Sequence, residues 1–205
     1  MCFYFQLSAD AQTLENRFKK SISNNKRIGN QVYFNAFEHP HVPVVLKNND
    51  SIQYFEWGLI PNWAKNNTIQ KHTLNARIET LHEKPSFKNV LMNRCIIPAT
   101  GFYEWQWLDK KGKNKQRFLI QSKNVSIFCF AGLTSEWVDI TTGEVKNTFT
   151  IVTTQANELM SKIHNTKQRM PVILKTSDEN AWLNGEDYTD FAFPYSTDMI
   201  ASEIS

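Results

Sequence analysis

The second residue of the chain, Cys2, has a distinctive chemical potential. Cysteine is small enough for removal of the leading Met1, and that removal would leave Cys2 with both a thiol and a free α-amine. Such an amine has a pKa near ~7.7–8.0, so part of it is neutral at pH 7. A neutral amine and a thiol on adjacent carbons trap an aldehyde as a Schiff base that closes to a thiazolidine. The same pair also suits an N-terminal nucleophile hydrolase, whereas an incidental cysteine beside an apolar strand has neither role.

An acidic residue lies among large aromatic residues in the segment Phe102–Trp107. Strand alternation places the aromatic residues at 103, 105 and 107 on one face, and Glu104 on the other with Phe102. A carboxyl group enclosed by aromatic rings has a raised pKa, which suits a general acid. The alternative is a solvent-facing glutamate on an amphipathic strand.

A histidine, His164, ends a segment with helical periodicity. It can interact with the carboxyl end of that helix, or act as a base or proton shuttle at a site. No spacing among histidines and cysteines fits a zinc site, so we expect no metal. The four other histidines have polar surroundings without a partner pattern: His39, His41, His72 and His82.

Two further segments carry residues suited to a polar or flat ligand. In Asn75–Thr80, Arg77 could bind a phosphate through its forked guanidinium, and Asn75 could orient a polar substrate. A proline-bearing turn precedes Trp63 and could present this ring as a stacking platform for a base. The alternatives are a polar strand end with surface charges and a tryptophan of the core.

The composition favours a folded intracellular domain. Of the 205 residues, 41% are hydrophobic and 21% are charged, which excludes a disordered chain. No apolar run is long enough to cross a bilayer, and the first residues do not resemble a signal peptide. Three cysteines without close pairs favour a reducing cytoplasm, with Cys95 and Cys129 as small core residues. We expect a cytoplasmic protein without a membrane partner.

The charge is unevenly distributed along the chain, although the net charge is only +3. Residues 61–125 carry 12 basic and 4 acidic residues, which favours a polyanionic partner. Much of this excess lies in 110–117, which reads as a solvated hairpin turn. The segment after Lys175 has seven acidic residues and no basic ones, so we expect residues 176–205 to pack on or trail the domain.

Many short strands and a few separate helices predict an α+β fold, with mostly antiparallel sheets closing toward a barrel or sandwich and peripheral helices. We expect one domain over residues 1–205. Strand patterns occur at Gln31–Phe37, Val42–Lys47, Ser51–Trp57, Arg94–Ile97, Phe102–Leu108, Gln116–Ser122, Val125–Gly132, Glu144–Thr153 and Pro171–Leu174. Helical patterns occur at Ser8–Lys20, Ser86–Asn93, Thr154–His164 and Ser177–Asn184, with Ser8 and Ser177 as the expected caps.

Six ordered blocks of the sequence resemble the SOS response-associated peptidase (SRAP) family. They extend from residue 2 to about residue 174, and they are Met1–Cys2, Trp57–Trp63, Asn75–Thr80, Arg94–Trp105, Thr153–Asn157 and His164–Val172. The resemblance implies a single-domain protein of the DNA damage response that guards abasic sites in single-stranded DNA. It implies a monomer without a cofactor, associated with a bacterial nucleoid.

The resemblance also implies roles for individual residues. Cys2 is the nucleophile that forms a thiazolidine with the ring-opened sugar, and Glu104 is the acid/base residue. His164 assists the lyase-like Schiff-base chemistry, and Asn75 positions the terminal amine or the sugar. The family's peptidase label fits removal of the protein's own leading Met. On the DNA path the resemblance places Arg77 at a phosphate, with Trp63 and Thr153 as lining residues.

The chain departs from the family pattern at two places. Family members often begin Met-Cys-Gly-Arg, whereas here Phe3 and Tyr4 follow Cys2, which removes a cation near the nucleophile. Four residues also separate His164 from Arg169, so no role is assigned to Arg169. Two other functions remain open, namely a thiol peptidase or amidohydrolase that acts on other proteins, and a non-catalytic single-strand binding module.

Overall fold

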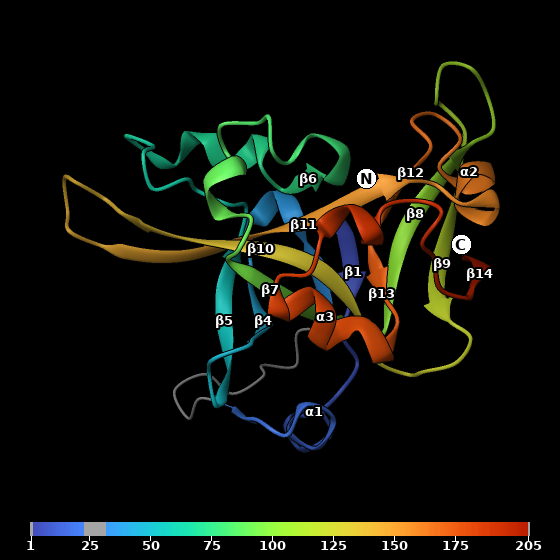
Figure 1. Ribbon diagram of the computed structural model, residues 1–205. Coiled ribbons are helices and arrows are strands. Elements are labelled where there is room, and N and C mark those ends of the chain that lie inside the picture. The colour runs from blue at the N-terminus through green and yellow to red at the C-terminus, as the bar shows by residue number, and fades with distance from the viewer. Residues whose placement is uncertain (1, 23–31, 205) are drawn as a thin grey trace.

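The structure is a computed structural model that describes residues 2–22 and 32–204. It contains two large sheets with the helices at their periphery (Figure 1). One sheet has five strands in the order β14-β9-β8-β1-β3, and the other runs β12-β11-β10-β7-β4-β5-β2. These strands are β1 (Tyr4–Gln6), β2 (Ser21–Ile22), β3 (Tyr33–Asn35), β4 (His41–Leu46), β5 (Ser51–Trp57), β7 (Arg94–Ala99), β8 (Gly101–Trp107), β9 (Lys115–Ser122), β10 (Phe128–Val138), β11 (Val145–Gln155), β12 (Arg169–Pro171) and β14 (Met199–Ile204).

The second sheet closes on itself. Besides pairing with β10, β11 pairs in parallel with β5, where Phe149 lies opposite Trp57. The strands β5, β4, β7, β10 and β11 therefore form a closed ring, with β6 (Asn75–Arg77) paired to β11 and β13 (Ile173–Leu174) paired to β10. Most pairings are antiparallel, and the predicted α+β fold with sheets closing toward a barrel is confirmed.

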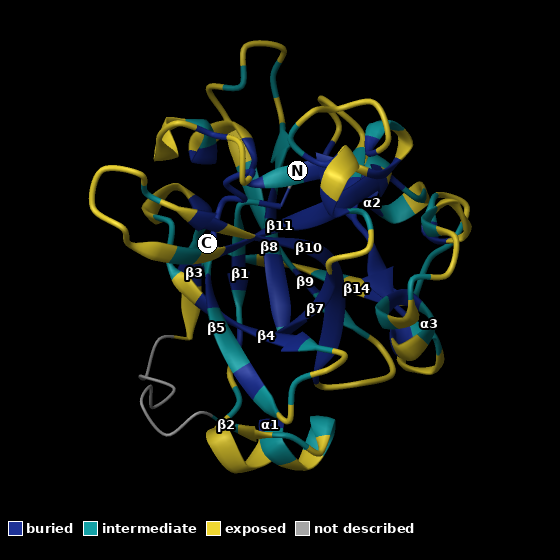
Figure 2. Ribbon diagram, turned by 60° about the vertical axis from the view of Figure 1, so that its left-hand side comes forward, coloured by how far each residue is buried: buried dark blue, intermediate teal, exposed yellow. Residues whose placement is uncertain are grey.

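The five-stranded sheet packs on this barrel through aromatic side chains. Phe5 of β1 lies edge-on to Phe130 of β10, with ring centroids 5.6 Å apart. Phe102 of β8 contacts the same ring at 5.8 Å. All three are fully buried, and each such ring removes about 150–250 Å² from water. The burial colours of Figure 2 place the dark, buried strands at the centre and the exposed residues in the surrounding loops.

The helices are shorter than expected, although α3 (Glu179–Asn184) ends at the predicted residue. The first helix, α1, is Ala11–Phe18, and its cap is Asp10 rather than Ser8, because the Asp10 carboxylate accepts the Thr13 N–H at 2.8 Å. The pattern at Ser86–Asn93 gives only a 3-10 turn, Lys88–Val90. The strand β11 continues to Gln155, so the next helix, α2, covers only Glu158–Ile163.

Several predicted strands are confirmed, and others were missed. The pattern at Ser51–Trp57 matches β5 with the same bounds. The strand expected at Gln31–Phe37 is β3, Tyr33–Asn35, and Gln31 lies outside the described residues. Sequence patterns did not indicate β1, β6 or β14. These strands have three, three and six residues, and each is defined by long-range pairing.

The acidic segment after Lys175 packs against the two sheets. Its helix, α3, is Glu179–Asn184, and Ser177 does not cap it. The Trp182 ring of α3 is fully buried beneath the Arg94 guanidinium at 4.4 Å, and its Nε1 donates to the Cys95 carbonyl at 3.0 Å. The last strand, β14, extends the five-stranded sheet beside β9. Among the described residues, no helix is long and apolar enough to span a membrane.

Candidate active site

Cys2 lies just before β1, between β6 and the five-stranded sheet. Its side chain is completely buried, and its backbone carbonyl accepts a hydrogen bond from Asn75 Nδ2 at 3.0 Å. The Cys2 thiol points toward the Tyr4 carbonyl at 3.8 Å. Burial raises the pKa of this thiol well above its usual value, because a thiolate is poorly solvated there. The thiol is therefore protonated at neutral pH, and its use as a nucleophile requires a proton acceptor.

Glu104 is the titratable group next to this thiol. Because β1 pairs with β8 and Tyr4 lies opposite Tyr103, Glu104 is held beside the start of β1. The side chain is only 4% exposed, so the alternative of a solvent-facing glutamate is wrong. Burial raises the pKa of Glu104 to about 7, so both protonation states are populated at neutral pH. A charged Glu104 in turn raises the pKa of Cys2, as expected for neighbouring groups.

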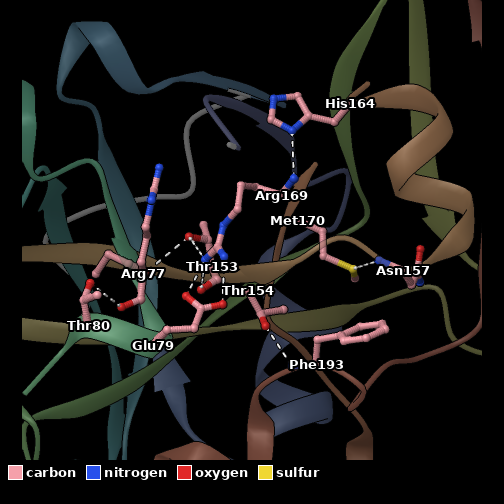
Figure 3. A network of polar contacts seen from close by, with 11 residues as sticks. Arg77, Glu79, Thr80, Thr153, Thr154, Asn157, His164, Arg169, Met170 and Phe193 are labelled. Atoms are coloured by element: carbon pink, nitrogen blue, oxygen red, sulfur yellow. Dashed lines mark hydrogen bonds and ion pairs between the residues drawn. The ribbon is translucent and has the colours of Figure 1, made fainter. Parts of the chain in front are cut away.

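His164 follows α2 and has a defined protonation state. The Arg169 backbone N–H donates to its Nδ1 at 3.1 Å, which leaves the ring proton of the neutral form on Nε2 (Figure 3). Burial lowers the pKa of His164 to about 4, so the imidazole is neutral near pH 7. In this state Nε2 can donate a hydrogen bond but cannot accept a proton. The geometry favours a hydrogen-bond donor over the general base that the sequence left open.

A cavity of about 340 Å³ brings these groups together. Glu104 from β8 and His164 from the end of α2 both line it, although they are far apart in the chain. The two residues after Cys2 also form part of its wall. The full lining consists of Phe3, Tyr4, Glu104, Trp105, Trp107, Lys115, His164 and Thr166. The arrangement offers a reacting molecule a buried acid, a neutral imidazole donor and an adjacent thiol.

The model of the SOS response associated peptidase (SRAP) family matches residues 1–204 of the chain. The chain belongs to this family. It is 46% identical over 165 residues to "Abasic site processing protein YoqW" of Bacillus subtilis, across 77% of this chain and 71% of that protein. It is 32% identical over 152 residues to "Abasic site processing protein HMCES" of Gallus gallus, across 62% of this chain and 44% of the relative.

A crystal structure of a Bacteroides thetaiotaomicron protein also resembles this SRAP chain. Its TM-score is 0.90 at 37% sequence identity, and the match covers all of this chain and 92% of the other. The resemblance inferred from the six sequence blocks is therefore confirmed at the level of the family. The roles that the resemblance implies for individual residues remain predictions, which the geometry of each side chain supports or opposes.

The residues expected on a DNA path of this SRAP protein differ in accessibility. Arg77 ends β6 and is exposed, as a phosphate contact requires. The Trp63 ring is 51% exposed and donates from Nε1 to the Pro85 carbonyl at 3.3 Å, so it is not a core residue. Thr153 lies opposite Arg77 in the sheet but is fully buried, and its hydroxyl donates to the Ala76 carbonyl at 3.3 Å. The Thr153 hydroxyl is therefore not exposed at the surface in this conformation.

Arg169, which received no role from the sequence, connects these elements. Its guanidinium forms two hydrogen bonds with the Glu79 carboxylate, at 2.7 and 2.9 Å, and donates to the Thr153 carbonyl at 2.8 Å (Figure 3). The four residues after His164 form a turn in which Gln168 has a φ of 50° and its N–H donates to the His164 carbonyl at 2.9 Å. This turn returns the chain so that Arg169 lies beside the imidazole.

The sequence contained a signal for Arg169 in the Arg-Met-Pro portion of the last SRAP block. The longer spacing to the histidine obscured it, because spacing along a chain does not reveal a turn. Cys95 and Cys129 are fully buried core residues, as expected. Among the described residues, no group of three or more histidine, cysteine or acidic side chains could hold a metal ion.

Proposed function

We propose that this SRAP protein captures abasic sites in single-stranded DNA by forming a covalent thiazolidine through Cys2. The observation that carries the proposal is the placement of the Cys2 thiol beside a buried carboxyl group with a pKa near 7, at a cavity that also holds a neutral His164. The relatives YoqW and HMCES are abasic site processing proteins by name, which supports the same substrate. The capture would protect the lesion during the response to DNA damage.

The first step is hydrolysis of the Met1–Cys2 peptide bond by one water, which releases methionine and exposes the Cys2 amine. The protein itself or a cellular aminopeptidase removes the residue. Autocatalytic removal would be the cysteine peptidase activity of this chain. In either case the reactive species has an α-amine and a thiol on adjacent carbons, without a cofactor.

The amine then attacks the aldehyde carbon of the ring-opened abasic sugar. The resulting carbinolamine loses one water to give an imine, and the Cys2 sulfur adds to the imine carbon to close the ring. The thiol proton ends on the ring nitrogen, so capture releases one water in total. We assign to Glu104 the proton given to the departing hydroxyl and the proton taken from the thiol, because both of its states are populated near pH 7.

The surrounding residues bind and orient the strand in this proposal. His164 donates a hydrogen bond from Nε2 to a sugar oxygen, and Asn75 holds the backbone of Cys2 through its carbonyl. Arg77 binds a phosphate, and the exposed Trp63 ring stacks on a base. Thr153 acts indirectly, as a buried residue that binds Arg169. We further propose that the protein acts as a monomer on bacterial cytoplasmic DNA, at the nucleoid.

The state of the Cys2 thiol distinguishes this function from a thiol peptidase that acts on other proteins. Such peptidases use a thiolate, and their nucleophile has a lowered pKa. Here burial raises the pKa of the thiol, which suits late addition to an imine after the amine has reacted. A non-catalytic module that binds single-stranded DNA does not require a buried carboxyl group such as Glu104.

A denaturing gel tests the proposal. Mature protein mixed with a single-stranded oligonucleotide that carries one abasic site should give a shifted, heat-stable band. Prior reduction of the abasic aldehyde to an alcohol should abolish the band. Cys2→Ser retains the amine, so borohydride should still trap its imine, but the heat-stable band should be lost. Absence of any shifted band with the mature wild-type protein would refute covalent capture.

A further inference from the structure

One face of the five-stranded sheet carries a cluster of aromatic rings around a single arginine. Arg117 of β9 has its guanidinium 4.3 Å from the ring centroid of Tyr103, 5.6 Å from Trp105 and 5.9 Å from Tyr33. The rings come from β3 and β8, which flank β1 on either side, while the arginine comes from the next strand. We refer to Tyr33, Tyr103, Trp105 and Arg117 as the arginine cage.

The charge of Arg117 has no acid to neutralise it in the part of the chain that the structure describes. No ion pair there includes Arg117, and its Nε is buried without a hydrogen-bond acceptor. Cation–π contacts hold the guanidinium in place but leave its in-plane N–H donors without acceptors. A preorganised, uncompensated guanidinium of this kind suits the oxygen atoms of a phosphate group.

The arginine cage is continuous with the cavity of the candidate active site. Trp105 belongs to both, and the Tyr4 ring joins them because it contacts Trp105 at 5.1 Å and Tyr33 at 5.8 Å. Lys115 extends the positive charge along the same strand, with its ammonium 5.1 Å from the Trp107 ring. A single-stranded DNA that leaves the cavity along β8 and β9 would therefore contact aromatic rings and cations in succession.

The aromatic rings of the cage are accessible enough to bind a ligand. Tyr33 is 39% exposed, and Tyr103 and Trp105 are half-buried. Contiguous exposed aromatic residues are uncommon on a protein surface that binds nothing. A nearby carboxylate, Glu38, is held by the side-chain amide of Asn35 at 2.8 Å. Lys115 and Arg117 give β9 two cations at this face, beside Glu38 and the buried Glu104 of the adjoining cavity.

We propose that the arginine cage binds the unpaired nucleotides next to the captured abasic site. Arg117 receives one phosphate, and the Tyr33 ring stacks on the adjacent base. The inference rests on the proposed function for the position of the abasic sugar in the cavity. Tyr4 contacts the Tyr33 and Trp105 rings on this face of the sheet, and Arg117 supplies the cation there from β9.

Affinity measurements over a range of salt concentrations distinguish the contact of Arg117 with a phosphate from the stacking of Tyr33 on a base. The probe is a fluorescent single strand with a central abasic site reduced to the alcohol, which prevents crosslinking. Arg117→Gln should weaken binding and reduce the log–log salt slope by about 0.7, the value of one phosphate contact on single strands. Tyr33→Ala should weaken binding about 5- to 20-fold at every salt concentration with an unchanged slope, and Tyr33→Phe should bind as the wild type does.

A change in the DNA tests whether the Tyr33 ring meets a base. Replacing the bases on one side of the lesion by base-free spacers should weaken wild-type binding by the same factor as Tyr33→Ala. The Tyr33→Ala variant should not respond to the same replacement. As a control, Lys47→Gln removes an exposed cation from the turn between β4 and β5, away from the chain's N-terminal end (Figure 1), and should leave binding within twofold.

The outcomes distinguish the cage from the proposed function. If both Arg117→Gln and Tyr33→Ala bind the probe with wild-type affinity and salt slope, the arginine cage does not bind nucleotides. The same conclusion follows if the base-free spacers weaken binding equally in the wild type and in Tyr33→Ala. If the wild type also fails to crosslink unreduced abasic DNA, covalent capture is refuted regardless of the affinity results. If it crosslinks while the cage variants bind normally, only the cage is refuted.

Discussion

Replacing the buried carboxyl group of Glu104 by an amide should affect stability and chemistry in opposite directions. In the folded protein, burial raises the pKa of Glu104 from 4.5 to about 7. The folded state therefore binds a proton more tightly than the unfolded state, and the wild-type free energy of unfolding falls as pH rises from about 4.5 to 7. The difference between the two pKa values corresponds to about 3 kcal/mol.

The variant Glu104→Gln lacks this titration. Its free energy of unfolding, relative to the wild type, should therefore increase by about 3 kcal/mol between pH 4.5 and pH 8. The comparison between two pH values cancels the constant contribution of burying an amide. Urea denaturation followed by tryptophan fluorescence measures the difference at each pH. If the difference in free energy of unfolding between variant and wild type is independent of pH, Glu104 does not have a raised pKa in the folded protein.

The same variant should crosslink abasic DNA more slowly, by about 10²- to 10⁴-fold, because the amide cannot transfer a proton. The wild-type rate should change with pH near 7, where Glu104 titrates, and the variant should lose that inflection. Single-turnover rates on a denaturing gel measure both effects. A folded variant that crosslinks at the wild-type rate would show that Glu104 has no part in the chemistry.

Three other perturbations test the site. Protein that retains the leading methionine, or carries an N-terminal tag, should crosslink as poorly as Cys2→Ala. Intact mass confirms the state of the N-terminus, and a denaturing gel measures crosslinking. Normal crosslinking by such protein would refute a mechanism that needs both the α-amine and the thiol of Cys2. If about four phosphates are neutralised, the single-strand salt slope should be roughly −3, and Arg77→Ala should flatten it by about 0.7 or less; a slope near zero would contradict this. Glu79→Gln weakens the hydrogen bonds that hold the Arg169 guanidinium, and the Arg169 N–H donates to His164 Nδ1. The nitrogen NMR signals of His164 in this variant should therefore show a mixture of tautomers, whereas the wild type shows the Nε2–H form alone. Identical signals in variant and wild type would exclude a role of the Arg169–Glu79 pair in positioning His164.

Some features of the site followed from the sequence because they depend on local pattern. Alternation along Phe102–Trp107 predicted that Glu104 would share a face with Phe102, and both are buried. Helical periodicity placed His164 at a helix end, where the structure has it. The run Ser51–Trp57 matched β5, because it follows a turn of polar residues and is rich in residues that favour strands.

Other features depended on pairings that no local pattern contains. Alternation could not decide which face of the Glu104 strand is buried, since that follows from the packing of β1 and β8 on the barrel. It also could not show that Thr153 is buried, because β11 is covered on both faces. A strand covered on both faces lacks the alternation that distinguishes an interior residue from a surface one.

The composition and the six ordered blocks determined the class of fold and the family, because both are properties of the chain itself. The tertiary structure decided the state of each reactive group. The protonation of Glu104 and Cys2 depends on burial, and the tautomer of His164 depends on a turn that brings back Arg169. The bond between Arg169 and Glu79 joins residues 90 positions apart. Such contacts arise only when the sheets close, so the solvent and charge around each group are set by the fold.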